Sequence, residues 1–401
     1  MKTALRQALN NIERLITRDA ESLTDPQERY MEFNRRLERT RRLMAQLDDP
    51  QQSFDVIHIG GTSGKGSIAV LCESVLLAAG HRVGTHTTPY LQTPLEKVRV
   101  NGMLISPEAL IELTARVQKA VDALRQFEDL GAPHYAEAWL GLALRHFADS
   151  GADISVIEVG MGGRFDCTNV VLPRVSVINT VHYDHTRVLG DELAEIAYHK
   201  AGIIKPGVPV VVGNLHPDAL KTVEIEARQR GARMVRLGKD ISFERISVSQ
   251  DGGYLTYHGL QGTLKDLRIG LLGKHQFANA AVALAALEIY EEATQTPIGE
   301  EAIRAGLAQV RFAGRLEIMQ RNPLVVLDGA HNEEKVEALV AALPDLFEYE
   351  RLVMVLGMLE TKNADPMMRA LASLADVIVT TKPRVKGKPA IDAEALAQLA
   401  R

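Results

Sequence analysis

One short stretch of the sequence places a strand, a glycine-rich turn and a helix start next to one another. Residues 55–60 hold the apolar, β-branched side chains that a buried parallel strand requires. The next segment, residues 60–66, contains four glycines, which tolerate positive φ and leave no Cβ between backbone and ligand. A helix expected over residues 67–79 would direct its positive end at the same point. The stretch therefore predicts an α/β fold with a phosphate-binding loop after a parallel strand.

Within this loop, Lys65 supplies a point charge and Ser67 a hydroxyl for phosphate or Mg²⁺. The strict pattern G-x-x-x-x-G-K-[ST] does not match, because its first glycine would fall on Ile59 and Gly66 separates the lysine from the serine. The alternative is a glycine-rich turn without a ligand. The residues that we expect to hold nucleotide phosphates are Gly61, Thr62, Ser63, Gly64, Lys65, Gly66 and Ser67.

Length and composition limit the class of protein. The 401 residues predict two domains, and a hydrophobic content of 46% is enough for full cores. A net charge of −5 does not favour a nucleic-acid partner, which would require a basic face. Two cysteines, Cys72 and Cys167, give no disulfide framework, and no run approaches the roughly 18 apolar residues of a membrane span. We therefore expect a cytoplasmic protein without membrane or nucleic-acid partners.

Strands and helices alternate along the first three quarters of the chain. Strands are expected at residues 82–87, 95–102, 153–159, 174–179 and 208–212, and helices at 3–17, 26–48, 107–129, 136–149, 191–201 and 276–292. This alternation predicts βαβ units and a parallel sheet covered on both faces. Residues 232–272 break the rhythm and predict a small antiparallel patch of short strands.

The segment Thr294–Pro297 has the composition of a linker. Beyond it, strands are expected at residues 324–327, 352–356 and 376–380, with helices between and after them and a last helix over 391–401. We therefore expect an N-terminal domain over residues 1–296 and a smaller α/β domain over residues 297–401.

Polar side chains follow several of the expected strands. Thr88 follows the second strand, Glu137 opens a helix, and His185 belongs to the cluster His182-Tyr183-Asp184-His185. Because the carboxyl ends of parallel strands share one sheet edge, these groups could form a Mg²⁺ site that keeps some of its waters. Taken singly, each has an ordinary alternative: a turn threonine, a helix-start carboxylate and a structural histidine.

Four further residues are candidates on weaker grounds. Lys200 ends a helix, where a cation is favourable without any function. Asn279 lies in the first turn of an alanine-rich helix and could contact a base or ribose, or cap the turn. Arg315 could stabilise the charge that develops during phosphoryl transfer, or it could form a surface ion pair. Asp328 follows an apolar strand and could bind a ligand there, or it could be an ordinary turn residue.

A series of motifs spans residues 30–385 in a fixed order. The segments are G-T-S-G-K-G-S, E-V-G-M-G-G-R-F-D-C-T-N, D-H-T-R-V-L-G, H-K-A-G-I-I-K-P-G, G-K-H-Q-F-A-N-A-A and D-G-A-H-N. This series resembles folylpolyglutamate synthase and dihydrofolate synthase, members of the Mur ligase superfamily. The resemblance implies a P-loop N-terminal domain, a Rossmann-like C-terminal domain and ATP between them. It also implies that glutamate's amine is joined to a folate or pteroate carboxylate.

Carried over motif by motif, the resemblance assigns a role to each candidate. Lys65, Lys200 and His185 would be catalytic, with Lys200 matching a lysine that is carbamylated in the family. Metal ligands would be Thr88, Glu137 and His185, and ATP-binding residues would be Gly61 to Ser67, Asn279, Arg315 and Asp328. The chain departs from the family at Thr88-Pro89-Tyr90-Leu91 in place of Ser-Pro-His-Leu, at Glu96-Lys97-Val98 in place of Glu-Arg-Ile, and at Ser63 in place of asparagine.

These observations predict an ATP-dependent amide ligase that works through an acyl phosphate. Its substrates would be ATP, L-glutamate and a folate or pteroate, with Mg²⁺ as cofactor, and we expect a monomer. One alternative is a Mur-type ligase with a different carboxylate acceptor. The other is a regulatory protein that binds ATP without ligation, for which the phosphate loop alone would suffice.

Overall fold

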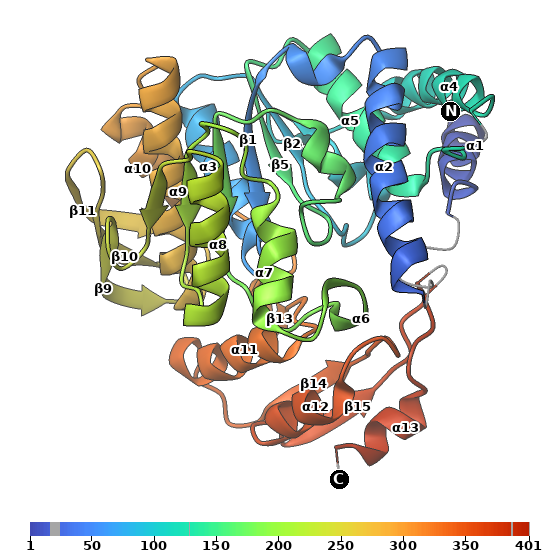
Figure 1. The fold of residues 1–401 in the computed structure, drawn as a ribbon. Helices are drawn as coiled ribbons and strands as arrows, with labels where there is room; N and C mark the ends of the chain where they lie inside the picture. The colour runs from blue at the N-terminus through green and yellow to red at the C-terminus, as the bar shows by residue number, and fades with distance from the viewer. Residues whose placement is uncertain (17–24, 128, 386–387, 401) are drawn as a thin grey trace.

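The computed structural model describes residues 1–16, 25–127, 129–385 and 388–400, and its centre is one large, mostly parallel sheet (Figure 1). The strand order is β4-β3-β2-β5-β1-β6-β7-β8. The strands are β1 Asp55–Gly60, β2 Val83–His86, β3 Arg99–Val100, β4 Met103–Leu104, β5 Ile154–Glu158, β6 Val175–Ile178, β7 Val210–Val212 and β8 Met234–Arg236. All neighbours from β2 to β8 pair in parallel, which confirms the expected sheet.

Helices cover both faces of this sheet, because its parallel strands are apolar on both sides. On one face, Ile57 and Ile59 of β1 pack in a core with α3 Lys65–Ala78 and α9 His275–Thr294. On the other face, Val56 packs with α1 Lys2–Glu13, α2 Pro26–Gln46, α4 Pro107–Leu124 and α5 Tyr135–Asp149. On the same second face, helices α7 Leu193–Ala201 and α8 Pro217–Gln229 cover strands β6 and β7.

The expected antiparallel patch is present as a three-stranded sheet. Its strands are β9 Ser242–Ser249, β10 Gly252–His258 and β11 Thr263–Ile269, in the order β11-β10-β9. Leu255 and Tyr257 are buried in the same core as α9, so the patch is an extension of the α3–α9 face.

Several local expectations differ from the structure. The helix expected over residues 107–129 ends at Leu124, and residues 128 and 401 of two expected helices lie outside the described residues. Residues 95–102 are not one strand, because Thr93 caps a 3₁₀ helix over Pro94–Lys97 before the short hairpin of β3 and β4 begins. Helix α8 is present in the structure but was not expected from the sequence. Its buried face includes small residues such as Ala219 and Ala227, which give a weak hydrophobic pattern. The first helix ends at Glu13, and residue 17 of its expected span lies outside the described residues.

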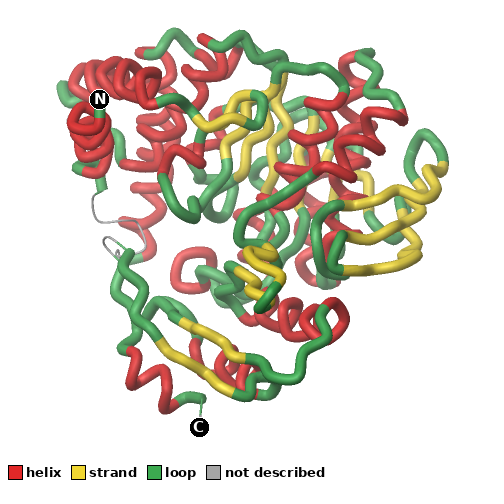
Figure 2. The backbone as a smooth tube through the Cα atoms, turned by 180° about the vertical axis from the view of Figure 1, so that it is seen from behind, coloured by secondary structure: helices red, strands yellow, loops and turns green. Residues whose placement is uncertain are grey.

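The C-terminal domain is a separate, smaller α/β unit, seen below the large sheet in Figures 1 and 2. It contains an antiparallel pair and a parallel pair of strands. Its elements are β12 Glu317–Arg321, β13 Leu324–Leu327, α11 Glu333–Leu346, β14 Val353–Leu356, α12 Ala364–Ala372, β15 Val377–Thr380 and α13 Ala393–Gln398. Helices α11 and α12 share one apolar core with β12 to β15.

The packing break between the domains does not coincide with Pro297. Helix α10, Glu300–Gln309, lies against α3 so closely that a Cβ at Gly306 would meet the backbone of Val75. The hydroxyl of Ser74 also donates to the Gly306 carbonyl at 2.7 Å. Helix α10 therefore packs on the N-terminal sheet's helix α3, whereas the expected boundary groups it with the C-terminal residues.

Among the described residues, no helix has both the length and the apolar character required to cross a bilayer.

Candidate active site between the domains

The glycine-rich loop connects β1 directly to α3. Gly64 caps the helix in a left-handed conformation with φ of 79°, and Gly61 has φ of 136°, so both positions need glycine. A Cβ at Gly64 would also collide with the side-chain amides of Asn179 and Asn279. Helix α3 begins at Lys65, which places the loop amides at its positive end, as an anion site requires.

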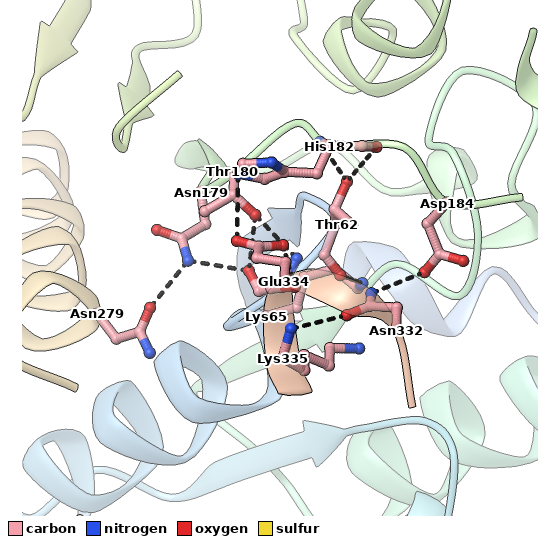
Figure 3. Close-up of polar contacts among 11 residues, drawn as sticks. Thr62, Lys65, Asn179, Thr180, His182, Asp184, Asn279, Asn332, Glu334 and Lys335 are labelled. Atoms are coloured by element: carbon pink, nitrogen blue, oxygen red, sulfur yellow. Dashed lines mark hydrogen bonds and ion pairs between the residues drawn. The ribbon is translucent and has the colours of Figure 1, made fainter. Parts of the chain in front are cut away.

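Residues at the end of β6 hold this loop in place. The backbone amides of Thr62 and Ser63 donate to the carbonyl and the hydroxyl of Thr180, at 2.7 and 2.9 Å. The side-chain nitrogen Nδ2 of Asn179 donates to the Ser63 carbonyl and to Oδ1 of Asn279, both at 2.9 Å (Figure 3). Asn279 is thus buried behind the loop and supports it through Asn179.

Lys65 lies inside the loop that it completes. Its Nζ donates to the carbonyls of Gly61 and Thr62, at 3.0 and 3.2 Å. Burial raises the pKa of Glu158 and lowers that of Lys200; the charge of Lys65 opposes the first shift and adds to the second. Lys65 is therefore the central cation of the site.

Glu158, the last residue of β5, brings a carboxylate to the loop. It is buried, and its Oε2 accepts a hydrogen bond from the Thr88 amide at 2.9 Å. A Cβ at Gly66 would lie 3.4 Å from the same oxygen. Burial raises the pKa of Glu158, and the charges of Lys65 and Arg315 oppose that rise. The sequence signal was an acid ending an otherwise apolar strand, at the sheet edge where ligands bind.

Glu137, the expected metal ligand, is not brought to this site. Its carboxylate is buried against helix α2, where Nε of Arg39 donates to both oxygens at 3.1 and 3.0 Å. The Thr40 hydroxyl and the His134 amide also donate to it. Because Glu137 closes the capping box of α5 and neutralises a buried arginine, we correct this expectation and assign it a structural role.

His185 and Asp184 lie in the loop after β6 and face the C-terminal domain. His185 has φ of 53° and is partly exposed, with Nε2 3.9 Å from Oδ1 of Asp184. Asp184 pairs with Lys362 at 3.1 Å and accepts a hydrogen bond from Asn332 at 3.3 Å. Burial would raise the pKa of Asp184, but His185 and Lys362 hold it well below its usual value. Asp184 thus joins the two domains as an anion.

Lys200 ends α7 but does not face solvent. Its side chain is buried, and burial together with the charge of Lys65 lowers its pKa to about 7. The charges of Asp184 and Glu334 oppose this lowering of the pKa. An exposed helix-capping cation would not have this environment.

The two C-terminal candidates have different surroundings. Arg315 lies with its guanidinium carbon 5.0 Å from the centre of the Phe312 ring and borders a cavity between the domains. Asp328 is occupied locally, since its two oxygens accept from the amides of Leu316 and Ala330, at 2.9 and 2.7 Å. In this structure Asp328 orders the turn after β13, which was the ordinary alternative for it.

Helix α11 supplies two residues that the sequence did not single out, Glu334 and Lys335. The Ser63 hydroxyl donates to Glu334 at 2.6 Å, and Nζ of Lys335 donates to Nε2 of His331 at 3.0 Å. His331 donates from Nδ1 to the Gly329 carbonyl, so its Nε2 is the acceptor. Burial and the nearby Lys335 lower the pKa of His331 to about 4, which keeps the ring neutral. No local sequence pattern identifies Glu334 and Lys335 as site residues, because the arrangement of the two domains brings them to the phosphate loop.

A cavity of about 420 Å³ opens beside the loop, between α3 and the chain that enters the C-terminal domain. The α3 wall consists of Val70, Glu73, Ser74 and Leu77. The opposite wall includes Tyr90, Leu91, Phe312, Arg315 and His331. Its walls combine apolar and charged side chains, and they include the ion pair of Glu73 and Arg99 at 2.8 Å.

Comparison with known proteins agrees with this architecture. The family model of the Mur ligase middle domain matches residues 134–287, and that of the Mur ligase glutamate ligase domain matches residues 314–401. A phosphate loop on a parallel sheet, facing a second α/β domain of this type, defines an ATP-dependent ligase of the Mur class.

Similar proteins narrow the family. The chain is 37% identical over 343 residues to dihydrofolate synthase/folylpolyglutamate synthase of Bacillus subtilis, which covers 85% of this chain and 80% of the relative. A structure of Mycobacterium tuberculosis folylpolyglutamate synthase complexed with ADP has a TM-score of 0.89 at 33% identity and covers 99% of this chain and 86% of that one. A complex named FPGS-AMPPCP-folate has a TM-score of 0.86 at 33% identity, covering 99% and 93%. The chain belongs to the folylpolyglutamate synthase/dihydrofolate synthase family.

Proposed function

We propose that the protein uses ATP to join the amine of L-glutamate to the carboxylate of a folate or pteroate. The observation that carries this proposal is the position of the cavity, which is lined by Arg315 and by Phe312, the ring that a Cβ at Gly66 of the phosphate loop would meet. A carboxylate beside Arg315 would lie within the field of Lys65 and Arg315, where a phosphoryl group could reach it.

In the proposed reaction, an oxygen of the acceptor carboxylate attacks the γ-phosphorus of ATP, and ADP leaves with the bond electrons. The neutral glutamate amine then attacks the acyl carbon, phosphate leaves with the electrons of the broken C–O bond, and the nitrogen loses one proton to give the amide N–H. Lys65 and the loop amides would stabilise the phosphoryl charge from the N-terminal domain, and Arg315 from the C-terminal domain. Both domains are therefore needed for the first step.

The residues around Glu158 fit a Mg²⁺ ion. Within the described chain, no group of three His, Cys, Asp or Glu side chains could enclose a metal ion by itself. A nucleotide-bound Mg²⁺ needs only one or two protein carboxylates, because phosphates and waters complete its shell. We propose that the Glu158 carboxylate and the Thr88 hydroxyl hold the ion, with His185 as a further ligand. When bound, Mg²⁺ would neutralise charge on the phosphates.

The cavity also suits the shape of the acceptor. Its α3 wall runs from Val70 to Leu77, a length of about 10 Å along the helix. A pteroate is flat and elongated, with its carboxylate at one end and its heterocycle at the other. We propose that its rings lie between Leu91 and Phe312 with the heterocycle near Glu73.

A substrate panel tests the proposal. The protein would be incubated with ATP, Mg²⁺ and L-glutamate, with dihydropteroate, tetrahydrofolate or an unrelated carboxylic acid as acceptor, while ADP release is measured. ADP release that requires both glutamate and a pterin-bearing acceptor supports the function. Release with another acceptor alone would favour a different Mur-type ligase, and binding of ATP without release would favour a regulatory role.

We further propose that the enzyme acts as a monomer in the cytoplasm. The site is completed within one chain, because Arg315 and Lys335 come from its own C-terminal domain. Sedimentation of the protein with and without ATP would test this, and a dimer that alone carries activity would contradict it.

A further inference from the structure

A side chain of the C-terminal domain occupies the phosphate loop. Glu334, the second residue of α11, extends its carboxylate to the loop from the opposite side of the domain interface (Figure 3). Its Oε2 accepts a hydrogen bond from the Ser63 hydroxyl at 2.6 Å, and its Oε1 lies 3.2 Å from Nε2 of His182. An anion is thus bound to the loop by the chain itself.

The surroundings of this carboxylate are cationic. Burial and the charges of Lys65 and Lys335 lower the pKa of Lys200, and the charge of Glu334 opposes that shift. Clusters of ammonium groups around a helix N-terminus are the environment that phosphate groups require. The Glu334 carboxylate is therefore bound where the phosphates of a nucleotide would find their partners.

We propose that Glu334 is a built-in competitor of the nucleotide, bound to Ser63 when the loop is empty and displaced when ATP binds. The inference rests on the proposed function only in that ATP binds at this loop. A carboxylate and a phosphate cannot both accept the single hydroxyl proton of Ser63, and at short range they repel each other. Nucleotide binding therefore includes the loss of the Glu334 contacts.

Other contacts would keep the domains together during this exchange. Asp184 remains paired with Lys362 and hydrogen-bonded to Asn332, the residue that caps α11. Glu334 can therefore leave Ser63 by a change in its own side chain or a small tilt of α11. The device lowers the affinity for nucleotide without needing the domains to separate.

The neighbouring residue Glu333 offers a matched control. It has the same charge and lies one position earlier on α11, but it is exposed and accepts a hydrogen bond from Asn363 at 2.8 Å. Neutralising Glu333 changes the net charge of the helix start as neutralising Glu334 does, without touching the phosphate loop.

The test is calorimetric titration of ATP and of ADP into the parent protein, Glu334→Gln, Glu334→Ala and Glu333→Gln, without acceptor or glutamate. Removing one competing hydrogen bond is worth about 1 kcal/mol, so Glu334→Gln should bind ATP roughly three- to tenfold more tightly. Glu334→Ala should gain at least as much, and Glu333→Gln should match the parent. Thermal melting of each variant establishes that it is folded.

Equal or weaker ATP binding by both folded Glu334 variants would overturn the inference, because the carboxylate would then be neutral or helpful to the nucleotide. An equal gain in Glu333→Gln would also overturn it, because the effect would be one of net charge. In both cases the parent still binds ATP and the proposed function stands. Failure of every variant to bind ATP would contradict the proposed function together with the inference.

Discussion

Oε2 of Glu158 accepts a hydrogen bond from the backbone amide of Thr88 at 2.9 Å, which joins the ends of two neighbouring parallel strands. Within the described chain, the hydrogen bonds of Glu158 involve only this oxygen. The other oxygen of the carboxylate can therefore take a cation at the phosphate loop. This relationship supports the proposal that the strand end of β5, rather than the helix start of α5, supplies the metal-binding carboxylate.

Glu158→Gln should therefore lose Mg²⁺-dependent ligation by roughly 100-fold or more, the scale found when one charge-stabilising group is removed from an active site. The glutamine has the same shape and can still accept from the Thr88 amide, so the fold should remain. Initial rates over a range of Mg²⁺ concentrations measure the effect. A variant with parental rates at all Mg²⁺ concentrations would exclude Glu158 as a ligand.

Glu137→Gln is the matched change on a buried carboxylate for which we expect a structural role. It leaves the buried charge of Arg39 with Glu32 as its remaining acidic partner, at 3.0 Å. We expect a loss of unfolding free energy of roughly 3 kcal/mol, with the rate per folded molecule near the parental value. Urea unfolding measures the loss of stability, and active-site titration gives the rate per folded molecule. A large fall in rate at unchanged stability would restore Glu137 to the metal site.

Lys65→Ala should abolish measurable turnover while leaving the protein folded. Among the described residues, the ammonium donates only to the loop carbonyls of Gly61 and Thr62, so its removal opens no core. We expect at least a 100-fold loss of ligation, because the principal cation at the phosphates is missing. Ligation rates with the thermal midpoint as control test this, and near-parental ligation by a folded variant would contradict it.

The sequence predicted the parts of the fold that local pattern determines. The loop after β1 was recognised because apolar β-branched residues, glycines and a lysine occur together, and the antiparallel patch because turns interrupt the βαβ rhythm. The short hairpin of β3 and β4 was mistaken for one longer strand, since Pro94 and the capping role of Thr93 were not weighed. Helix α8 was missed because alanines give a weak helical period.

The sequence predicted the position of a candidate site residue only where that residue directly follows a strand in the chain. Lys65 and Thr88 follow directly from β1 and β2. Glu137 and Glu158 are both buried acids near expected sheet edges, and only the tertiary structure shows that one of them is paired with Arg39. Glu334 comes from another domain, and no spacing along the chain encodes its contact with Ser63.

Truncation tests the position of the domain boundary. Because α10 packs on α3, a fragment of residues 1–313 should be more stable than one of residues 1–296, which exposes the α3 surface that α10 covers. Both fragments lack Arg315, so neither should ligate. Thermal midpoints and ADP release measure the two effects. Full activity of residues 1–296 would show that Arg315 and Asp328 are structural.

The last prediction concerns Lys200, where two roles have opposite consequences. If Lys200 is only a cation at the end of α7, Lys200→Arg keeps the charge and should cost little. If it is carbamylated, as the resemblance implies, the group that it presents is an anion, which arginine is not expected to form.

The surroundings of Lys200 favour the carbamate. A carbamate forms from the neutral amine and CO₂, and a pKa of about 7 means that the neutral fraction rises as the pH passes from 6 to 8. We therefore expect bicarbonate to stimulate ligation more at pH 8 than at pH 6. Lys200→Arg and Lys200→Ala should lose most ligation, and short carboxylic acids should partly restore the alanine variant. Because a labile carbamate can escape mass spectrometry, rates are the better measurement, and parental ligation by Lys200→Arg would refute the carbamate.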